Sequence, residues 1–225
     1  MAKTYQLFQI KLSSSGFINY AYLIMDKATK EAAIVDPAWE LSKITDLLRE
    51  TGAKLTTILL THSHNDHVNL VRPLAEKYGC QVYMSKKEIE YYRFSSPNLN
   101  AVNDQDVIQL GHTPITCIFT PGHTAGGICY QLSHSLFTGD TIFAEGCGMC
   151  DTEGGSPEEM YESIQRIKAH VNPDTCVYPG HSYGKEPGAP LRHLIANNIY
   201  FQFSRKDSFI RFRMRKNQKN LLRFQ

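Results

Sequence analysis

Apolar and polar residues alternate with two different periods along this chain of 225 residues. Short apolar and β-branched runs bounded by turn residues predict strands. In the first half, these runs fall at 5–11, 21–25, 32–35, 56–60 and 81–84. The second half predicts four short strands at 107–110, 115–119, 128–132 and 135–138, and one more at 175–178.

Helical periodicity appears between several of these strands. In the stretch 40–50, apolar residues recur at helical spacing, and Gly52 closes the segment. Ser156 and Pro157 are typical of a helix start, as the cap and the first-turn residue. Further helices are predicted at 70–78, 86–92 and 189–197, whereas 95–106 reads as polar and irregular. The first half is therefore β-rich and then alternates strand with helix, which is typical of an α+β domain.

The most concentrated chemistry lies directly after the strand at 56–60. The sequence there is Thr61-His62-Ser63-His64-Asn65-Asp66-His67. Polar, metal-capable side chains at a strand exit are costly to bury unless they pair or bind an ion. His62 and His64 are two apart, so in an extended segment they project from the same face. Three histidines and an aspartate within six positions favour a transition-metal centre over a polar loop with chance histidines.

Three further candidate ligands each follow a predicted strand. His123 follows Pro121-Gly122, Asp140 follows Gly139, and His181 follows Pro179-Gly180. The strand fixes the position of the ligand, and the glycine lets the backbone approach a metal closely. The sequence therefore predicts ligands from four separate segments of the chain.

These motifs resemble those of the metallo-β-lactamase-fold hydrolases, and most closely the glyoxalase II type, a thioester hydrolase. They are H-x-H-x-D-H at 62–67, P-G-H-T at 121–124, T-G-D at 138–140 and P-G-H at 179–181. The resemblance covers about residues 5–200 and implies a four-layer αββα sandwich with the metals at one edge. It implies one metal held by His62, His64 and His123, a second held by Asp66, His67 and His181, and Asp140 as the bridge. Two zinc ions are expected, although these ligands also accept iron or manganese.

The resemblance also implies a reaction, the hydrolysis of a thioester by water activated between two cations. Asp66 is expected to orient that water. Tyr183, two residues after His181, matches a family tyrosine beside the substrate, and simple packing is the alternative role for its ring. A thiolate leaving group has a conjugate-acid pKa of about 8.5, so the site needs no strong general acid.

Two departures from glyoxalase II bear on the thiol part of the substrate. After Gly146-Cys147-Gly148, that family places a lysine that grips glutathione, whereas Met149, Cys150 and Asp151 follow here. The long helical C-terminal domain of that family is replaced by a short tail. An uncharged arm, such as phosphopantetheine on an acyl carrier protein, suits this loop better.

The stretches 147–157 and 178–201 resemble the zinc-dependent hydrolases of bacterial polyketide gene clusters, which are thought to clear stalled acyl groups from carrier proteins. We therefore expect a thioester hydrolase acting on acyl carrier protein in polyketide and antibiotic biosynthesis. A glyoxalase II-like hydroxyacylglutathione hydrolase and a nuclease of the same fold are the alternatives.

The net charge of +2 conceals an uneven distribution. Residues 204–225 carry eight basic side chains and one acidic side chain, and we predict a catalytic domain at 1–203 followed by this basic tail. A basic tail can steer an acidic carrier protein toward the site. The roughly 40 residues between Asp140 and His181 leave little room for a nucleic-acid-gripping domain, so no nucleic-acid partner is expected.

The remaining composition bears on the compartment. The chain starts without a charged-then-apolar leader and has no apolar run of about 18 residues, so neither secretion nor a membrane span is expected. Six scattered cysteines suit reduced thiols and a cytoplasmic location. Cys147 and Cys150 form a C-x-x-C, and their glycine-rich surroundings favour a loop over a redox motif. The oligomeric state is left open.

Overall fold

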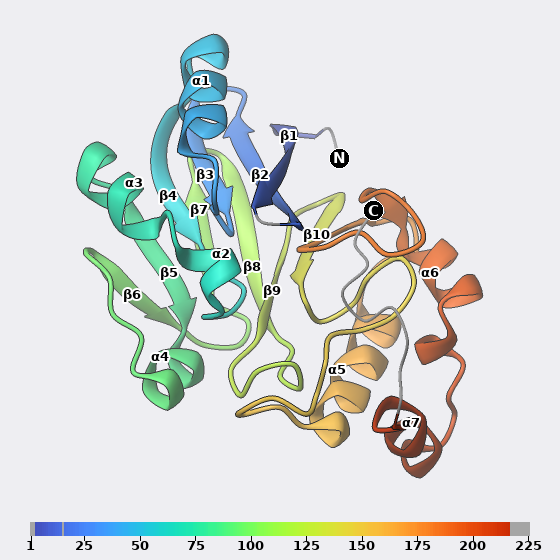
Figure 1. Cartoon of the computed structure of the whole chain (residues 1–225). Helices are drawn as coiled ribbons and strands as arrows, with labels where there is room; N and C mark the ends of the chain where they lie inside the picture. The colour runs from blue at the N-terminus through green and yellow to red at the C-terminus, as the bar shows by residue number, and fades with distance from the viewer. Residues whose placement is uncertain (1–2, 15, 217–225) are drawn as a thin grey trace.

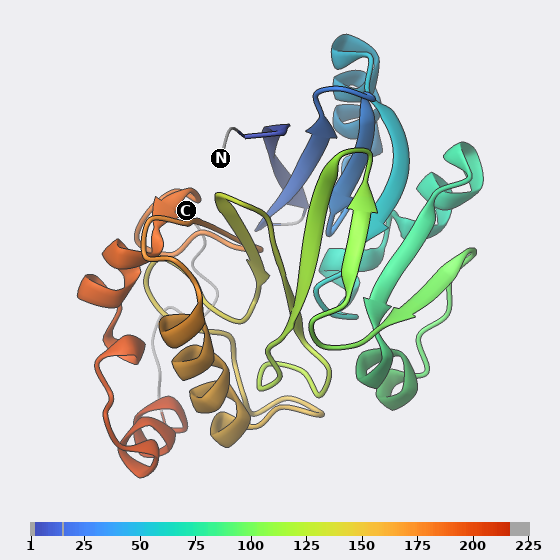
Figure 2. The same cartoon turned by 180° about the vertical axis from the view of Figure 1, so that it is seen from behind.

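The computed structural model describes residues 3–14 and 16–216 and contains two six-stranded sheets (Figures 1 and 2). The first sheet has the order β1 (Tyr5–Ser14), β2 (Phe17–Asp26), β3 (Glu31–Val35), β4 (Lys54–Leu59), β5 (Gln81–Ser85), β6 (Leu99–Val102). The second has the order β12 (Ala189–Pro190), β11 (Cys176–Pro179), β10 (Ser135–Gly139), β9 (Ile128–Gln131), β8 (Thr113–Phe119), β7 (Val107–Leu110).

Helices cover the outer face of each sheet. The first half supplies α1 (Leu41–Thr51), α2 (Asn65–Val68), α3 (Val71–Tyr78) and α4 (Lys86–Tyr92). The second half supplies α5 (Pro157–His170), α6 (Leu191–Asn197), the 3₁₀ turn η1 (Ile199–Phe201) and α7 (Lys206–Arg213). Figure 1 shows the first group of helices on one side of the molecule and α5, α6 and α7 on the other.

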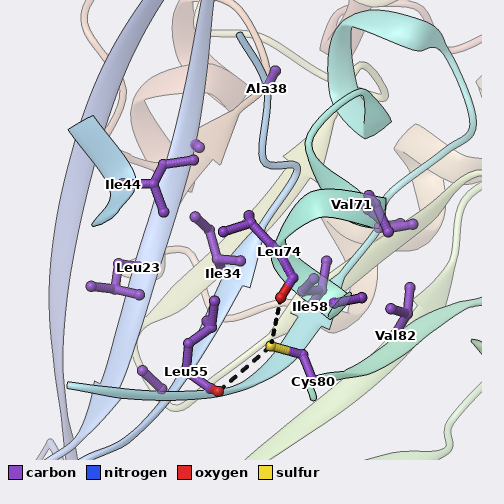
Figure 3. Close-up of a cluster of buried hydrophobic side chains, with 14 of the residues drawn as sticks. Leu23, Ile34, Ala38, Ile44, Leu55, Ile58, Val71, Leu74, Cys80 and Val82 are labelled. Carbon is purple, nitrogen blue, oxygen red and sulfur yellow. Dashed lines mark hydrogen bonds between the residues drawn. The ribbon is translucent and has the colours of Figure 1, made fainter. Parts of the chain in front are cut away.

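Three apolar clusters hold these layers together. Between the sheets, Tyr22 and Ile24 of β2 are buried in one cluster with Tyr130 of β9 and Phe137 of β10. Outside the first sheet, side chains of its strands pack with those of α1 and α3, as Figure 3 shows. A third cluster joins the second sheet to α5, α6 and α7. The layers are therefore helix, sheet, sheet, helix, which confirms the predicted α+β sandwich.

The strand directions bring several strand ends to one edge of the second sheet. Strand β9 runs antiparallel to both β8 and β10, and β10 runs parallel to β11. Strands β8, β10 and β11 therefore all end at the same edge. The segment after β4 lies at the same edge, because Ile128, the first residue of β9, donates its backbone N–H to the carbonyl of Thr61 at 3.0 Å. Strand β2 is tied to the same edge by Tyr20, whose N–H lies 2.8 Å from the carbonyl oxygen of Gly180.

The structure differs from the sequence predictions at 95–106 and 189–197, and it describes only part of the predicted tail. The prediction of irregular structure at 95–106 is wrong, because β6 lies within it and pairs in parallel with β5. In the predicted helix at 189–197, the first two residues form β12 and the helix begins at Leu191. The tail contains α7, which packs against α5, while Lys219 and Arg223 lie outside the described residues. The division of the chain at residue 203 stays a prediction.

Among the described helices, none has the length and hydrophobicity to cross a bilayer.

Candidate metal centre

The predicted ligands come from the ends of four strands that the topology gathers at one edge. His62 and His64 follow β4, and Asp66 and His67 lie on the short helix α2. The other three positions are His123 after β8, Asp140 after β10 and His181 after β11. The structure brings all seven side chains together, although they span almost 120 positions of the sequence.

The first group consists of imidazoles only. The ligand atoms of His62, His64 and His123 lie within 4.8 Å of one another. Nε2 of His123 is 3.0 Å from Nδ1 of His64, so the two ring nitrogens face the same small volume. Three nitrogen donors with this separation match the donor set that zinc accepts in catalytic sites.

The second group combines two imidazoles with a carboxylate. Asp66, His67 and His181 also have ligand atoms within 4.8 Å of one another. Oδ2 of Asp66 lies 3.3 Å from Nε2 of His181 and 3.6 Å from Nε2 of His67. Asn19 holds this aspartate, because its side-chain N–H donates to the backbone oxygen at 2.8 Å and to Oδ2 at 3.2 Å.

Asp140 lies between the two groups. Its Oδ1 is 3.5 Å from Nε2 of His67, and its Oδ2 is 3.5 Å from Nε2 of His181. The same Oδ2 is 3.6 Å from Nε2 of His123, which belongs to the first group. One carboxylate therefore reaches both groups, as a bridging ligand must.

Hydrogen bonds to the far ring nitrogens orient three of these imidazoles. Nδ1 of His123 donates to the carbonyl of Met149 at 2.7 Å, and Nδ1 of His181 donates to the carbonyl of Ile18 at 2.8 Å. Nδ1 of His67 donates to a carboxylate oxygen of Asp36 at 3.0 Å. Each bond places a proton on Nδ1, so that Nε2 is the nitrogen facing the centre, the arrangement that metal-binding histidines use.

His62 follows the same rule through a hydroxyl group. Thr61 Oγ1 donates to Oδ2 of Asp36 at 2.6 Å, so it can only accept from Nδ1 of His62 at 3.0 Å. Asp36 therefore orients two of the imidazoles, His62 and His67. Sequence reasoning missed this buried carboxylate. Its one sequence signal is a position at a strand exit, which it shares with the ligands.

Burial and nearby charges shift the pKa values of the histidines in opposite directions in the two groups. Burial and the neighbouring imidazole of His67 hold the pKa of His62 well below its usual range. Burial also lowers the pKa of His123, despite the opposite effect of Asp140. Burial alone would lower the pKa of His67, but the carboxylates of Asp66 and Asp140 raise it to about 10. The first group is thus neutral, whereas the second surrounds a place where positive charge is strongly favoured.

The residues present fit a pair of metal ions. Nε2 of His62, Nε2 of His67 and Oδ1 of Asp140 are buried and have no hydrogen-bond partner among the described residues. Buried polar atoms without a partner are costly, and three of them converge here. Two cations would satisfy these atoms and neutralise the carboxylates, so the arrangement is compatible with a dinuclear site.

Tyr183, the second predicted catalytic residue, lies at the border of this centre. Its ring packs on Phe143 with 4.8 Å between centroids, and Phe143 in turn lies 6.3 Å from the ring of His181. Burial raises the pKa of Tyr183, so its phenol keeps its proton at neutral pH. Its place is consistent with a substrate contact, and that role stays a prediction.

The loop that carries Cys147 and Cys150 is anchored by the C-terminal helix. Arg213 of α7 is buried and donates its Nε–H to the carbonyl of Gly148 at 2.9 Å. The adjacent residue, Met149, is the one whose carbonyl orients His123. Both cysteines are buried, and burial raises the pKa of Cys150 to about 11, so the pair is protonated at neutral pH. Sequence reasoning did not find this role for Arg213, which looks like one of many cations in a basic tail.

We expect Arg213→Met to lower the free energy of unfolding by about 1–3 kcal/mol, because the buried carbonyl of Gly148 loses its charged donor. Urea denaturation of the variant measures this loss. Arg211→Met, on the exposed side of the same helix, is the matched control and should change stability by less than about 0.5 kcal/mol. Equal losses in the two variants would contradict the anchoring role.

Comparisons with known proteins agree with this geometry. Residues 15–181 match the model of the metallo-beta-lactamase superfamily. Over 224 residues, covering all of both chains, the sequence is 54% identical to the probable polyketide biosynthesis zinc-dependent hydrolase PksB of Bacillus subtilis (strain 168). It is 37% identical to the hydroxyacylglutathione hydrolase of Pelagibacter ubique (strain HTCC1062) over 75% of this chain and 68% of that protein.

A solved structure with the same architecture is the metallo-beta-lactamase from Staphylococcus aureus. It superposes with a TM-score of 0.85 at 26% identity, covering 96% of this chain and 68% of that one. The family model covers most of the chain, and the full-length relative extends the likeness to the rest. The chain therefore belongs to the metallo-beta-lactamase superfamily.

Proposed function

We propose that this protein is a zinc-dependent hydrolase that cleaves acyl thioesters from the phosphopantetheine arm of an acyl carrier protein in polyketide biosynthesis. The observation that carries the proposal is the meeting of two ligand groups around one shared carboxylate, Asp140. The full-length likeness to a protein named as a polyketide biosynthesis hydrolase supports the biological setting.

In this proposal each group of ligands holds one ion. His62, His64 and His123 would hold the first, Asp66, His67 and His181 would hold the second, and Asp140 would be shared between them. When bound, such ions supply a Lewis acid for the acyl carbonyl and lower the pKa of water to about 7.

The protein side chains position the reactants around this chemistry. Asp66 is held by Asn19 and is the most exposed of the two carboxylates, at 27% against 12% for Asp140, so it can orient the attacking water. Tyr183 offers a protonated phenol to the acyl or thiol portion. The water oxygen adds to the acyl carbon, the C–S bond breaks, and the products are a carboxylic acid and a free thiol. The departing thiolate has a conjugate acid of pKa about 8.5 and needs no general acid.

The character of the loop beside the ligands supports an uncharged arm. Met149 is half-buried next to His123, and the loop offers no lysine at this place. The exposed cations of the described tail provide a positive surface for an acidic carrier protein; they are Arg205, Lys206, Arg211, Arg215 and Lys216.

The test is the loss of acyl mass from an acylated carrier protein, followed by mass spectrometry, with lactoylglutathione as the competing substrate. The proposal expects kcat/KM at least about tenfold higher for the carrier substrate, because its recognition adds interactions that a small thioester lacks. Raised salt should slow the carrier reaction and leave the thioester of free pantetheine unaffected. Fast cleavage of lactoylglutathione without cleavage of the carrier substrate would support the hydroxyacylglutathione hydrolase alternative instead.

A further inference from the structure

A buried carboxylate outside the ligand set connects two ligand-bearing segments. Glu88 of α4 is fully buried. Its Oε1 accepts from the backbone N–H of Ser63 at 2.8 Å and from the hydroxyl of the same serine at 2.7 Å. Its Oε2 accepts from the backbone N–H of Gly126 at 2.9 Å. Ser63 separates two predicted ligands, and Gly126 lies three residues after a third.

The start of α4 is packed tightly against the second of these segments. A Cβ on Gly126 would lie 2.1 Å from the backbone nitrogen of Glu88, so only glycine allows this approach. Ser85 caps α4 by accepting from the N–H of Glu88 at 3.1 Å, and its hydroxyl donates to the carbonyl of Gly126. The segment after β8 is therefore held to α4 from both its N–H and its C=O.

Glu88 is satisfied without a cation. No ion pair of this carboxylate occurs among the described residues, and its three donors are two backbone amides and one hydroxyl. A buried carboxylate is costly unless such bonds compensate it. Its oxygens are engaged by Ser63 and Gly126, and Glu88 is absent from the described groups that could hold a metal.

We infer that Glu88 is a positioning residue for the metal site of His62, His64 and His123. Its carboxylate fixes the distance between the segment after β4 and the segment after β8, which supply the two halves of that nitrogen group. The inference rests on the metal-binding part of the proposed function. It assigns α4 a task that its sequence, with lysines and glutamates on either side, does not indicate.

Replacing the Glu88 carboxylate by an amide should affect only one of the two groups of ligands. A carboxylate has acceptors on both oxygens, whereas the amide of glutamine has an acceptor on one side and a donor on the other. In Glu88→Gln, the NH₂ group must therefore face an N–H group of either Ser63 or Gly126. The two segments would move apart on that side. The second group, with Asp66, His67 and His181, has no contact with Glu88 and should keep its ion.

The experiment is zinc stoichiometry by native mass spectrometry during titration with a competing chelator, on wild type, Glu88→Gln and Ser63→Ala. We expect wild type to hold two ions, and Glu88→Gln to bind one of them about 10–100-fold more weakly while the other is unchanged, as for other residues that orient metal ligands. Ser63→Ala removes one of the three donors and should weaken the same ion by a smaller factor. Glu90→Gln, on the exposed face of α4, is the matched control and should bind both ions as wild type does.

The other outcomes distinguish a failure of the metal-binding proposal from a failure of the role of Glu88. A wild type that never holds two ions would overturn the metal-binding proposal itself. A wild type with two ions, together with Glu88→Gln and Ser63→Ala that keep both affinities, would overturn the role of Glu88 alone. Equal weakening of both ions would also overturn it, because a general loss of structure does not distinguish the two groups. If Glu88→Gln does not fold, Ser63→Ala alone decides by the same criterion.

Discussion

Replacing Asp140 by alanine is expected to remove metal and activity together. Its carboxylate lies within 3.6 Å of imidazoles from both groups, so each proposed ion loses a ligand at once. We expect kcat/KM for an acyl thioester to fall by about 10³-fold or more, which corresponds to about 4 kcal/mol of transition-state stabilisation. Metal analysis of the same preparation should find clearly fewer ions per chain than in wild type.

Asp46→Ala on α1 is a suitable control for this variant. Asp46 is half-exposed and, among the described residues, forms an ion pair with Arg49 of its own helix, so its replacement should leave metal content and turnover unchanged. An Asp140→Ala protein that retained two ions and near-normal turnover would show that Asp140 does not bridge them.

Replacing Gly180 by alanine is expected to have the second largest effect. A Cβ at this position would lie 2.5 Å from Cε1 of His67 and 2.7 Å from Oδ1 of Asp140. The backbone cannot simply retreat, because Gly180 is hydrogen-bonded to Gly139 at 2.9 Å and to Tyr20 at 2.8 Å. The two ligands must move instead, and misplacement by about 1 Å costs about 10²-fold in rate. Steady-state kinetics and metal content of the variant measure this effect.

Gly79→Ala separates this effect from the general cost of losing a glycine. Gly79 ends α3 with a positive φ of 68°, and a Cβ there meets no other atom within 4 Å. The substitution should lower stability by about 1 kcal/mol and leave kcat/KM unchanged. If both glycine variants reduced activity equally, the close approach of Gly180 to the ligands would have no special importance.

Strong periodicity of apolar residues made most helices and strands predictable. Its absence explains why β6 and α7 were not predicted. The strand β6 has four residues, and Asn100 interrupts its short apolar sequence, so it shows no strong periodic pattern. It forms at the edge of the first sheet, where β5 offers unpaired backbone groups and polar side chains are tolerated. Helix α7 was not predicted, because its sequence is basic and its buried positions, Phe209 and Arg213, do not form an apolar stripe.

The predicted ligands were found because four of them cluster at 62–67 and the other three each follow a strand and a glycine. The residues that orient them were not, since their roles depend on contacts between distant segments. Asp36 reaches Thr61, 25 positions away, and Glu88 reaches Gly126, 38 positions away. Glu88 also lies in a stretch with charged neighbours that is typical of a solvated helix face. Only the packing of α4 against the two segments reveals that its side chain points inward.

Two cations are expected between these seven side chains, and crystals of the zinc-loaded protein can reveal them. Anomalous difference maps at the zinc edge are expected to show two peaks. One should lie about 2.0–2.1 Å from Nε2 of His62, Nδ1 of His64 and Nε2 of His123, and the other at a similar distance from Asp66, His67 and His181. Asp140 should contact both peaks. A map without peaks at this edge of the sheets, or with peaks only elsewhere on the molecule, would contradict the claim.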